Sequence, residues 1–228
     1  AKHNQYSLMR ALQYLALEWR ICGAADILDG VLTPADTLIM PGGADLFYVE
    51  KLNGAGNQII RAFVEEGGIY IGICAGAYYG PARLDWDNGD IAGTRELAFY
   101  QGTAIGPIYE FIEDGDITKS WRKTVTLEWA DGTITHSHYQ AGPVFEPDAD
   151  CAAEVLARYA DLPGVPAAIV KCRVGKGTAI LSSPHIEVTQ ATADQEIYAH
   201  QNPSVTRDLQ EAEKLCKDNM LKKLIESV

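Results

Sequence analysis

A single cysteine, Cys74, lies between two glycines in the stretch GICAG, which covers residues 72–76. The stretch follows IYI, a run of β-branched and aromatic residues that is typical of a strand. Most free cysteines are small buried hydrophobes, and that is one interpretation of Cys74. The other is a nucleophile on a tight turn between a strand and a helix, where the helix N-terminus favours the reactive thiolate.

Two further segments carry the groups that a cysteine nucleophile needs. His185 and Glu187 follow a strand-like run in ILSSPHIE, so the imidazole could face Cys74 and the carboxylate could face the imidazole. A nucleophile, a base and a carboxylate that orients the base form a catalytic triad. Residues 41–44 (PGGA) follow another strand-like run, and their backbone amides could bind an oxyanion. The three segments together favour the nucleophile over the buried thiol.

These segments are expected at one edge of a parallel sheet. The runs DTLIMPGG and IYIGIC indicate strands, and residues 57–66 between them indicate a helix that ends at two glycines. Strands that alternate with helices predict an α/β fold of three layers with a doubly wound, mostly parallel sheet. Ligands of such sheets bind at the carboxyl ends of the strands, where Cys74 would lie.

Further elements are predicted around this sheet. The segment WRICGAADI reads as another short strand, and hairpins are predicted where Asp131-Gly132 and Gly175-Lys176-Gly177 each separate two strand-like runs. Apolar residues at helical spacing predict amphipathic helices over about residues 6–18 and 204–228. Because the chain opens almost directly on the first of these helices, we expect a core strand to be missing ahead of it.

The composition favours one domain and disfavours several classes of partner. A chain of 228 residues with 47% hydrophobic residues can bury one substantial core, so we expect a single domain over residues 1–228. Thirty-one acidic residues against nineteen basic ones give a net charge of −12 without a basic cluster, which disfavours nucleic acids and anionic membranes as partners. No apolar run approaches the ~18 residues that a membrane span needs.

The cysteine pattern indicates a reducing compartment. The five cysteines are odd in number, widely spaced and without a Cys-x-x-Cys pair; they are Cys22, Cys74, Cys151, Cys172 and Cys216. This pattern suggests neither a disulfide framework nor a zinc site, so we expect a cytoplasmic protein. Ala1 is not an initiator methionine, so an exported form that has lost a signal peptide stays open.

Several motifs, in the same order, resemble known proteins. IMPGG, GICAG and SPHIE resemble the oxyanion strand, the nucleophile elbow and the His-x-Glu segment of class I glutamine amidotransferases, which have a flavodoxin-like fold. Longer stretches resemble the amidotransferase-like domain at the N-terminus of biotin–protein ligases, which also occurs as free-standing bacterial proteins. These stretches are PGGADLFYVEKLNGAGNQIIRAFVEEGGIYIGICAGAYYG, GTRELAFYQGTAIGP, HYQAGPVFEP and GKGTAILSSPHIE. The resemblance covers about residues 5–190.

The resemblance implies a role for particular residues. Cys74 corresponds to the nucleophile, His185 to the base and Glu187 to the carboxylate that orients the base. The backbone N–H groups of Gly43 and Ala75 correspond to the donors that bind the oxyanion. The implied activity is cleavage of an amide through a thioester at the cysteine.

Two positions depart from the glutaminase pattern. Tyr78 lies four residues after the nucleophile, where glutaminases of this class typically carry a glutamine that helps to bind the substrate amide. This change weakens glutamine as the substrate more than it weakens Cys74 as the nucleophile. His-Ile-Glu in place of His-Pro-Glu is a lesser change. The sequence also lacks a Gly-Arg-Gly-Arg type of biotinyl-adenylate loop, so biotin ligation by this chain alone is not expected.

Other residues are weaker candidates. The candidates for lining the substrate pocket are Gly42, Tyr78, Arg95 and Glu96. The Arg95-Glu96 pair could equally be an ordinary surface ion pair. His136 and His138 lie two apart in a predicted strand and would face one side, but no third metal ligand is near in the sequence. A polar strand face is therefore favoured over a metal site.

The leading hypothesis is a cysteine-dependent amidase or amidotransferase-like hydrolase that acts on a small-molecule amide. The alternative is a non-catalytic binding or regulatory module on the same fold, which Tyr78 and the lack of an ammonia-accepting domain both permit. A peptidase on this scaffold would need a pocket open to an extended chain. A protein partner or a homodimer stays open, and no cofactor, metal, nucleic acid or membrane is expected.

Overall fold

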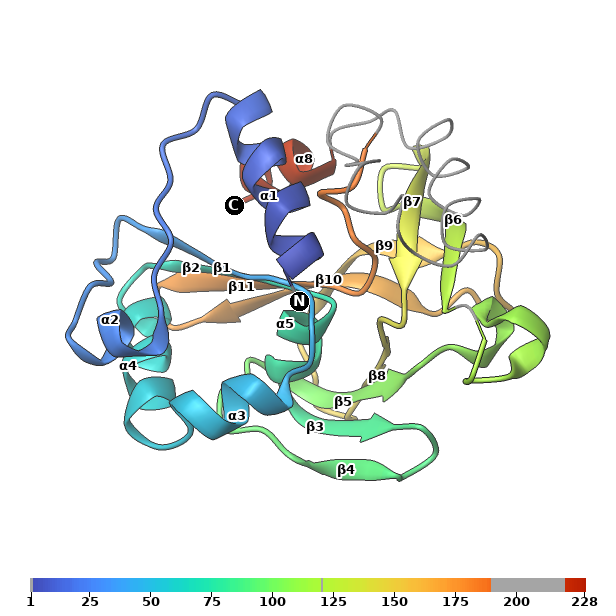
Figure 1. The fold of residues 1–228 in the computed structure, drawn as a ribbon, viewed down its shortest axis with the longest axis horizontal. Helices are drawn as coiled ribbons and strands as arrows, with labels where there is room; N and C mark the ends of the chain where they lie inside the picture. The colour runs from blue at the N-terminus through green and yellow to red at the C-terminus, as the bar shows by residue number, and fades with distance from the viewer. Residues whose placement is uncertain (1, 120, 190–219) are drawn as a thin grey trace.

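The computed structural model describes residues 2–119, 121–189 and 220–228 (Figure 1). The helices are α1 (Lys2–Tyr14), α2 (Ala24–Leu28), α3 (Leu46–Leu52), α4 (Ala55–Glu65), α5 (Ala75–Tyr79) and α8 (Met220–Glu226), with the 3₁₀ turns η1 (Tyr109–Phe111) and η2 (Glu113–Gly115). The strands are β1 (Thr37–Met40), β2 (Ile69–Ile73), β3 (Pro81–Trp86), β4 (Ile91–Thr94), β5 (Tyr100–Gly106), β6 (Arg122–Trp129), β7 (Ile134–Gln140), β8 (Val144–Pro147), β9 (Glu154–Tyr159), β10 (Ala167–Val174) and β11 (Gly177–Ser182).

The main sheet contains seven strands in the order β1-β2-β11-β10-β9-β6-β7. Strands β1, β2 and β11 are parallel to one another, and the other neighbouring pairs are antiparallel. The predicted α/β fold and both predicted hairpins, β6–β7 and β10–β11, are confirmed. The parallel part is smaller than expected because the hairpins extend the same sheet with antiparallel strands. In the described part of the chain, β1 forms one edge of the sheet and has β2 as its single partner.

The main sheet is buried on both faces, as the predicted three layers require. Successive residues of a strand point to opposite faces, so Ile71 packs in one apolar cluster with α1 and α8, whereas Tyr70 packs in another with α2, α3 and α4. Figure 1 shows α1 and α8 on one side of the sheet and α2 to α4 on the other. Among the described helices, none is long and apolar enough to cross a membrane.

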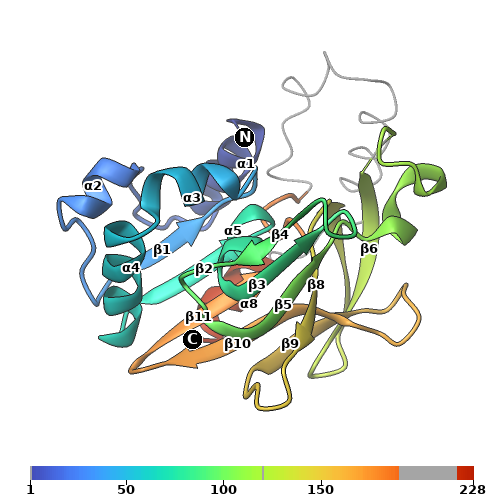
Figure 2. The same ribbon diagram turned by 90° about the horizontal axis from the view of Figure 1, so that it is seen from below.

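A second sheet, which was not predicted, contains four strands in the order β4-β3-β5-β8. Figure 1 shows β3, β4 and β5 below the main sheet, and Figure 2 shows the four strands side by side in front of it. Strands β3 and β4 form a hairpin around Asn88-Gly89, a dipeptide that favours tight hairpin turns. Buried residues of this sheet, including Leu84 and Phe145, join the apolar cluster of α4.

Three predictions about local structure are corrected or limited. The predicted strand WRICGAADI is wrong, because α2 begins inside it and the Asp26 carboxylate accepts a hydrogen bond from the Gly23 N–H, at 2.6 Å. The first helix is confirmed but begins and ends about four residues earlier than predicted. Of the predicted helix over 204–228, residues 204–219 lie outside the described residues, and α8 forms its last part.

Candidate active site

Cys74 lies on the turn between β2 and α5, at the carboxyl end of β2, which is paired on both sides by β1 and β11. Its backbone has φ 51° and ψ −100°, outside the regions that non-glycine residues ordinarily occupy. Such a conformation costs of order 1–3 kcal/mol, and it persists only where surrounding contacts hold it. One such contact is the hydrogen bond from the Cys74 N–H to the Ser182 carbonyl of β11, at 2.9 Å. The predicted strand-turn-helix arrangement is therefore present.

The glycines on either side of Cys74 allow close approach of the backbone. A Cβ atom on Gly72 would lie 2.3 Å from the Gly76 carbonyl oxygen, and a Cβ atom on Gly76 would lie 2.2 Å from the Met40 carbonyl oxygen. No side chain fits at such distances, so the GICAG pattern is a steric requirement of the turn. The contact with Met40 also brings the turn against the end of β1.

His185 and Glu187 lie just after β11, which pairs in parallel with β2. Ser182, three residues before His185, is the register partner of Ile73, the residue before Cys74. The His185 Nδ1 lies 2.7 Å from Glu187 Oε1, and both side chains are completely buried. Burial lowers the pKa of His185, but the charges of Glu187 and Cys74 outweigh burial, so the pKa is raised. The structure therefore brings the three predicted catalytic residues together at one sheet edge.

The thiol of Cys74 is directed to a backbone carbonyl. Its Sγ donates a hydrogen bond to the Gln140 oxygen, at 3.3 Å. The Nε2 atom of His185 has no hydrogen-bond partner of ordinary geometry among the described residues. Cys74 is nevertheless close enough to act on the His185 ring, because the sulfur is among the groups that raise the pKa of His185. Only 6% of the cysteine is exposed, so the site is closed.

The turn that covers the site comprises residues 140–142, at the end of β7. Ala141 has φ 58°, and its carbonyl oxygen accepts a hydrogen bond from the Tyr78 hydroxyl, at 3.0 Å. The Tyr78 ring is buried and packs edge-on against Trp86, with the ring centroids 5.5 Å apart. Tyr78, which the resemblance aligns with the amide-binding glutamine of glutaminases, thus uses its hydroxyl to hold this covering turn.

The predicted oxyanion turn follows β1. Gly42 is buried and Gly43 is exposed, with φ 148° at Gly43, in the region that favours glycine. The Pro41 carbonyl just before it accepts a hydrogen bond from the Tyr48 hydroxyl of α3, at 2.7 Å. Ala75 is the first residue of α5, where N–H groups have no acceptor within the helix. Both predicted oxyanion donors therefore lie in turns that meet at the contact between β1 and α5.

Arg95 and Glu96, two of the predicted pocket residues, have separate partners. The Arg95 Nε lies 2.7 Å from Asp45 Oδ2. Glu96 accepts hydrogen bonds from the Gly54 N–H, at 2.7 Å, and from Asn57 Nδ2, at 2.8 Å. These bonds, the Gly54 bond first, lower the pKa of Glu96.

The two histidines of β7 differ in environment. His136 is half-buried, whereas His138 is buried and its ring centroid lies 6.0 Å from that of His185. Burial, and then the positive charges of His185 and Arg122, lower the pKa of His138 well below its usual value. No group of three or more metal-binding side chains occurs within the described residues. His138 is therefore a neutral neighbour of the candidate base.

The sequence-based prediction of the site did not include Asp45, His138 or Gln140 as contributors. Gln140 and His138 belong to the stretch HYQAGP, which was one of the segments that resemble the ligase-associated domain. That resemblance was the available signal for the covering turn. Asp45 also lies in one of these segments, PGGADLFYVEK, but its partner Arg95 lies 50 residues away, so the sequence did not indicate their pairing.

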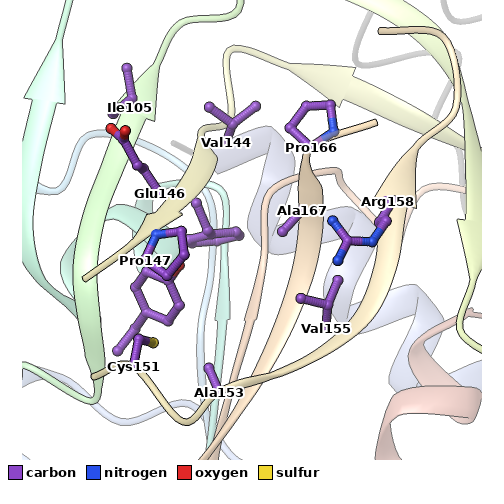
Figure 3. A pocket seen from close by; sticks show the side chains of 12 residues that line it. Ile105, Val144, Glu146, Pro147, Cys151, Ala153, Val155, Arg158, Pro166 and Ala167 are labelled. Carbon is purple, nitrogen blue, oxygen red and sulfur yellow. The ribbon is translucent and has the colours of Figure 1, made fainter. Parts of the chain in front are cut away.

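A separate cavity of about 470 Å³ lies between the second sheet and strands β9 and β10 (Figure 3). Its wall is mostly apolar and includes Val144, Pro147 and Val155. The charged side chains Glu146 and Arg158 lie on opposite sides of it (Figure 3). None of the predicted site residues lines this cavity, so it is distinct from the Cys74 site.

Comparison with known proteins identifies the family. The family model described as "Biotin-protein ligase, N terminal" matches residues 31–228. The chain belongs to this family. A protein of Chlamydia muridarum, described as uncharacterized, is 35% identical over 198 residues, which are 84% of this chain and 76% of that protein. The biotin–protein ligase of Schizosaccharomyces pombe is 32% identical over 164 residues, which are 68% of this chain but only 26% of the ligase.

The fold of this family member is that of a glutamine amidotransferase. A crystal structure of a glutamine amidotransferase superposes with a TM-score of 0.58 and covers 90% of this chain and 92% of its own. Its sequence is 22% identical, so the similarity shows the fold alone. The resemblance to the ligase-associated domain is therefore confirmed, and the resemblance to glutamine amidotransferases is confirmed for the fold.

Proposed function

We propose that this member of the biotin–protein ligase N-terminal family is a cysteine-dependent amidase or amidotransferase-like hydrolase, which acts on a small amide through a thioester at Cys74. The observation that carries the proposal is the buried His185–Glu187 contact of 2.7 Å beside the Cys74 turn. A buried imidazole with a raised pKa and a bound carboxylate is suited to accept the proton of a neighbouring thiol.

In the proposed first step, His185 accepts the proton of the Cys74 thiol, and the sulfur attacks the amide carbonyl carbon. The carbonyl oxygen becomes an oxyanion, to which the N–H groups of Gly43 and Ala75 would donate hydrogen bonds. The C–N bond then breaks, and the leaving nitrogen takes the proton from His185. Glu187 keeps the Nδ1 proton in place and stabilises the imidazolium.

In the second step, water resolves the thioester. His185 accepts a proton from a water molecule while the oxygen of that water molecule attacks the thioester carbon. The C–S bond breaks, the carboxylic acid leaves, and His185 returns the proton to the Cys74 sulfur. No other co-reactant is needed, so atoms and protons balance over the two steps.

A binding or regulatory module is the second candidate function. The observation that favours it is the closed site, in which the Cys74 thiol donates to Gln140 and the Tyr78 hydroxyl holds the covering turn. A protein that keeps this turn closed would retain the fold and a pocket without efficient turnover.

Covalent labelling distinguishes the two candidates. The protein is treated at neutral pH with a glutamine-analogue electrophile such as a diazo- or chloroketone, and the adduct is read by intact mass and peptide mapping. A catalytic site predicts one adduct at Cys74, no adduct in Cys74→Ser and strongly slowed labelling in His185→Ala. Labelling of Cys74 no faster than that of the other cysteines would favour the binding module.

A further inference from the structure

Asp45 and Arg95 form an ion pair that is largely withdrawn from solvent. The Arg95 Nε lies 2.7 Å from Asp45 Oδ2, and the two side chains are only 8% and 12% exposed. Burying two charges has a desolvation cost that offsets much of their attraction, so such a pair adds little net stability. Its charge-assisted hydrogen bond does fix the position of the Asp45 side chain relative to Arg95. The contacts around Asp45 indicate which part of the backbone is positioned in this way.

The pair anchors one end of the predicted oxyanion turn. Asp45 lies two residues after Gly43, and its carbonyl oxygen accepts hydrogen bonds from the N–H groups of Tyr48 and Val49, at 2.8 and 3.0 Å. The other end is anchored at Pro41, whose carbonyl accepts the Tyr48 hydroxyl. Residues 42–44 of the turn therefore lie between two residues that are held by hydrogen bonds, Pro41 and Asp45.

Gly43 itself cannot set the direction of its N–H group. Its φ of 148° is open to glycine alone, and glycine has few steric barriers to rotation about its backbone bonds. The orientation of the amide must come from the anchors on either side of the turn. Arg95 supplies the anchor that is distant in sequence, since it follows β4.

The pair also lies near the cysteine. Tyr48, whose N–H binds Asp45, packs its ring against Tyr79 of α5, with the ring centroids 5.5 Å apart. Burial, followed by the charges of Cys74 and Asp45, raises the pKa of its phenol, in agreement with this proximity. Glu96, next to Arg95, holds Asn57, and Asn57 in turn accepts a hydrogen bond from the Tyr79 hydroxyl of α5. The segment after β4 thus braces both the turn after β1 and the helix after Cys74.

We infer that Arg95 is a positioning residue for acyl transfer: by holding Asp45, it directs the Gly43 N–H toward the oxygen of an acyl group that reacts at Cys74. The inference rests on the proposed function. It assigns Arg95 to the geometry of the oxyanion turn and not to contact with the substrate.

Two reactions of the Cys74 thiol can distinguish a role of Arg95 in oxyanion binding from a general contribution of Arg95 to the stability of the fold. With p-nitrophenyl acetate, the Cys74 sulfur attacks the carbonyl carbon and an oxyanion forms before the C–O bond breaks and p-nitrophenolate leaves; the thiol proton passes to His185. With iodoacetamide, the sulfur displaces iodide from a saturated carbon and no oxyanion forms. Loss of oxyanion stabilisation therefore slows the first reaction and spares the second.

The experiment measures both rates under single-turnover conditions, with protein in excess, for the wild type, Arg95→Met, Arg95→Lys and Asp45→Asn. We expect Arg95→Met to slow acylation about 10- to 100-fold, since misplaced catalytic groups and lost oxyanion donors have effects of this order. Arg95→Lys keeps the charge and should lose less. Alkylation by iodoacetamide should change less than about twofold in each variant, because it forms no oxyanion for the turn to stabilise.

The matched control is Arg83→Met, because Arg83 pairs with Asp148 at the surface, where the side chains are 43% and 37% exposed. Both of its rates should equal those of the wild type. The inference is overturned if Arg95→Met slows both reactions equally or leaves acylation unchanged. If Arg95→Met does not fold, Arg95→Lys carries the same test. Absence of acylation at Cys74 in the wild type would instead refute the proposed function.

Discussion

The thiol of Cys74 donates its hydrogen bond to the carbonyl oxygen of Gln140, 66 residues further along the chain, at 3.3 Å. This contact directs the thiol proton toward a backbone carbonyl, while the Nδ1 atom of His185 contacts Glu187. A reacting carbonyl must lie within about 3–3.5 Å of the sulfur. We therefore expect the turn of residues 140–142 to shift when a substrate reaches Cys74.

Removal of the Tyr78 hydroxyl should make this shift easier. In Tyr78→Phe, the Ala141 carbonyl loses its hydrogen bond, which is worth about 1 kcal/mol, or about fivefold in the population of an open turn. We expect alkylation of Cys74 by iodoacetamide to become about fivefold faster. Tyr109→Phe is the control, because the Tyr109 hydroxyl donates its hydrogen bond to Asp87, in the turn between β3 and β4, and not to the turn of residues 140–142. An unchanged or slower rate in Tyr78→Phe would show that the turn does not limit access.

The cysteines should differ widely in reactivity at neutral pH. Burial, and then the charge of Cys151, raises the pKa of Cys172 to about 12, and burial followed by Asp26 raises that of Cys22. At pH 7 the thiolate of Cys172 is then roughly a thousandfold rarer than that of an ordinary cysteine. Limited labelling with iodoacetamide and peptide mapping should find Cys74 modified first. Equal labelling of Cys74 and Cys172 would contradict a catalytic role for the His185–Glu187 pair.

Much of the site could be predicted because its signals are local. The apolar runs of β1, β2 and β11, the glycines around Cys74 and the His-x-Glu spacing each lie within a few residues. Parallel strands end at one edge of a sheet, so these local signals also predict a common location. The actual contacts at that edge agree with this expectation, since Ser182 binds the Cys74 N–H.

The remainder depends on contacts between distant segments. The Gln140 turn lies 66 residues from Cys74, and Arg95 lies 50 residues from Asp45. Residue types alone do not determine which distant partners meet, because strand order and register decide it. The second sheet was missed for the same reason, since β5 pairs in parallel with β3 and antiparallel with β8. The capping of α2 by Asp26, in contrast, is a local signal that the sequence contains, but the segment WRICGAADI around it was predicted wrongly as a strand.

Glutamine should be a poor substrate. By the sequence resemblance, Tyr78 corresponds to the glutamine that helps glutaminases of this class to bind the substrate amide, and its hydroxyl is already bonded to the Ala141 carbonyl. We expect ammonia release from glutamine by the isolated protein to be weak or absent, even where an electrophile labels Cys74 rapidly. A coupled ammonia assay with Cys74→Ser as the blank measures this directly. Robust, Cys74-dependent ammonia release would show that amide recognition comes from other residues.

His138 should make the protein sensitive to mild acid. Its pKa in the folded chain lies well below the ordinary value of 6.5, because burial and then His185 and Arg122 disfavour the charged ring. Between pH 6.5 and 5 the unfolded chain binds a proton at this residue and the folded chain does not, so the free energy of unfolding falls by up to about 1.4 kcal/mol per pH unit. The raised pKa of His185 acts in the opposite direction: it favours the folded chain increasingly as the pH falls toward 6.5, and its contribution levels off below that value, where the ring is protonated in both states.

The substitution His138→Met replaces the buried ring with an apolar side chain of similar size and should remove this component of the slope. Urea unfolding of both proteins at pH 7.5, 6.5, 5.8 and 5.0 measures the difference, with His136→Met on the same strand as the control. We expect the wild type and His136→Met to lose stability in parallel as the pH falls, while His138→Met loses clearly less. Parallel loss in all three proteins would mean that His138 is protonated in the folded chain, with another group meeting its charge.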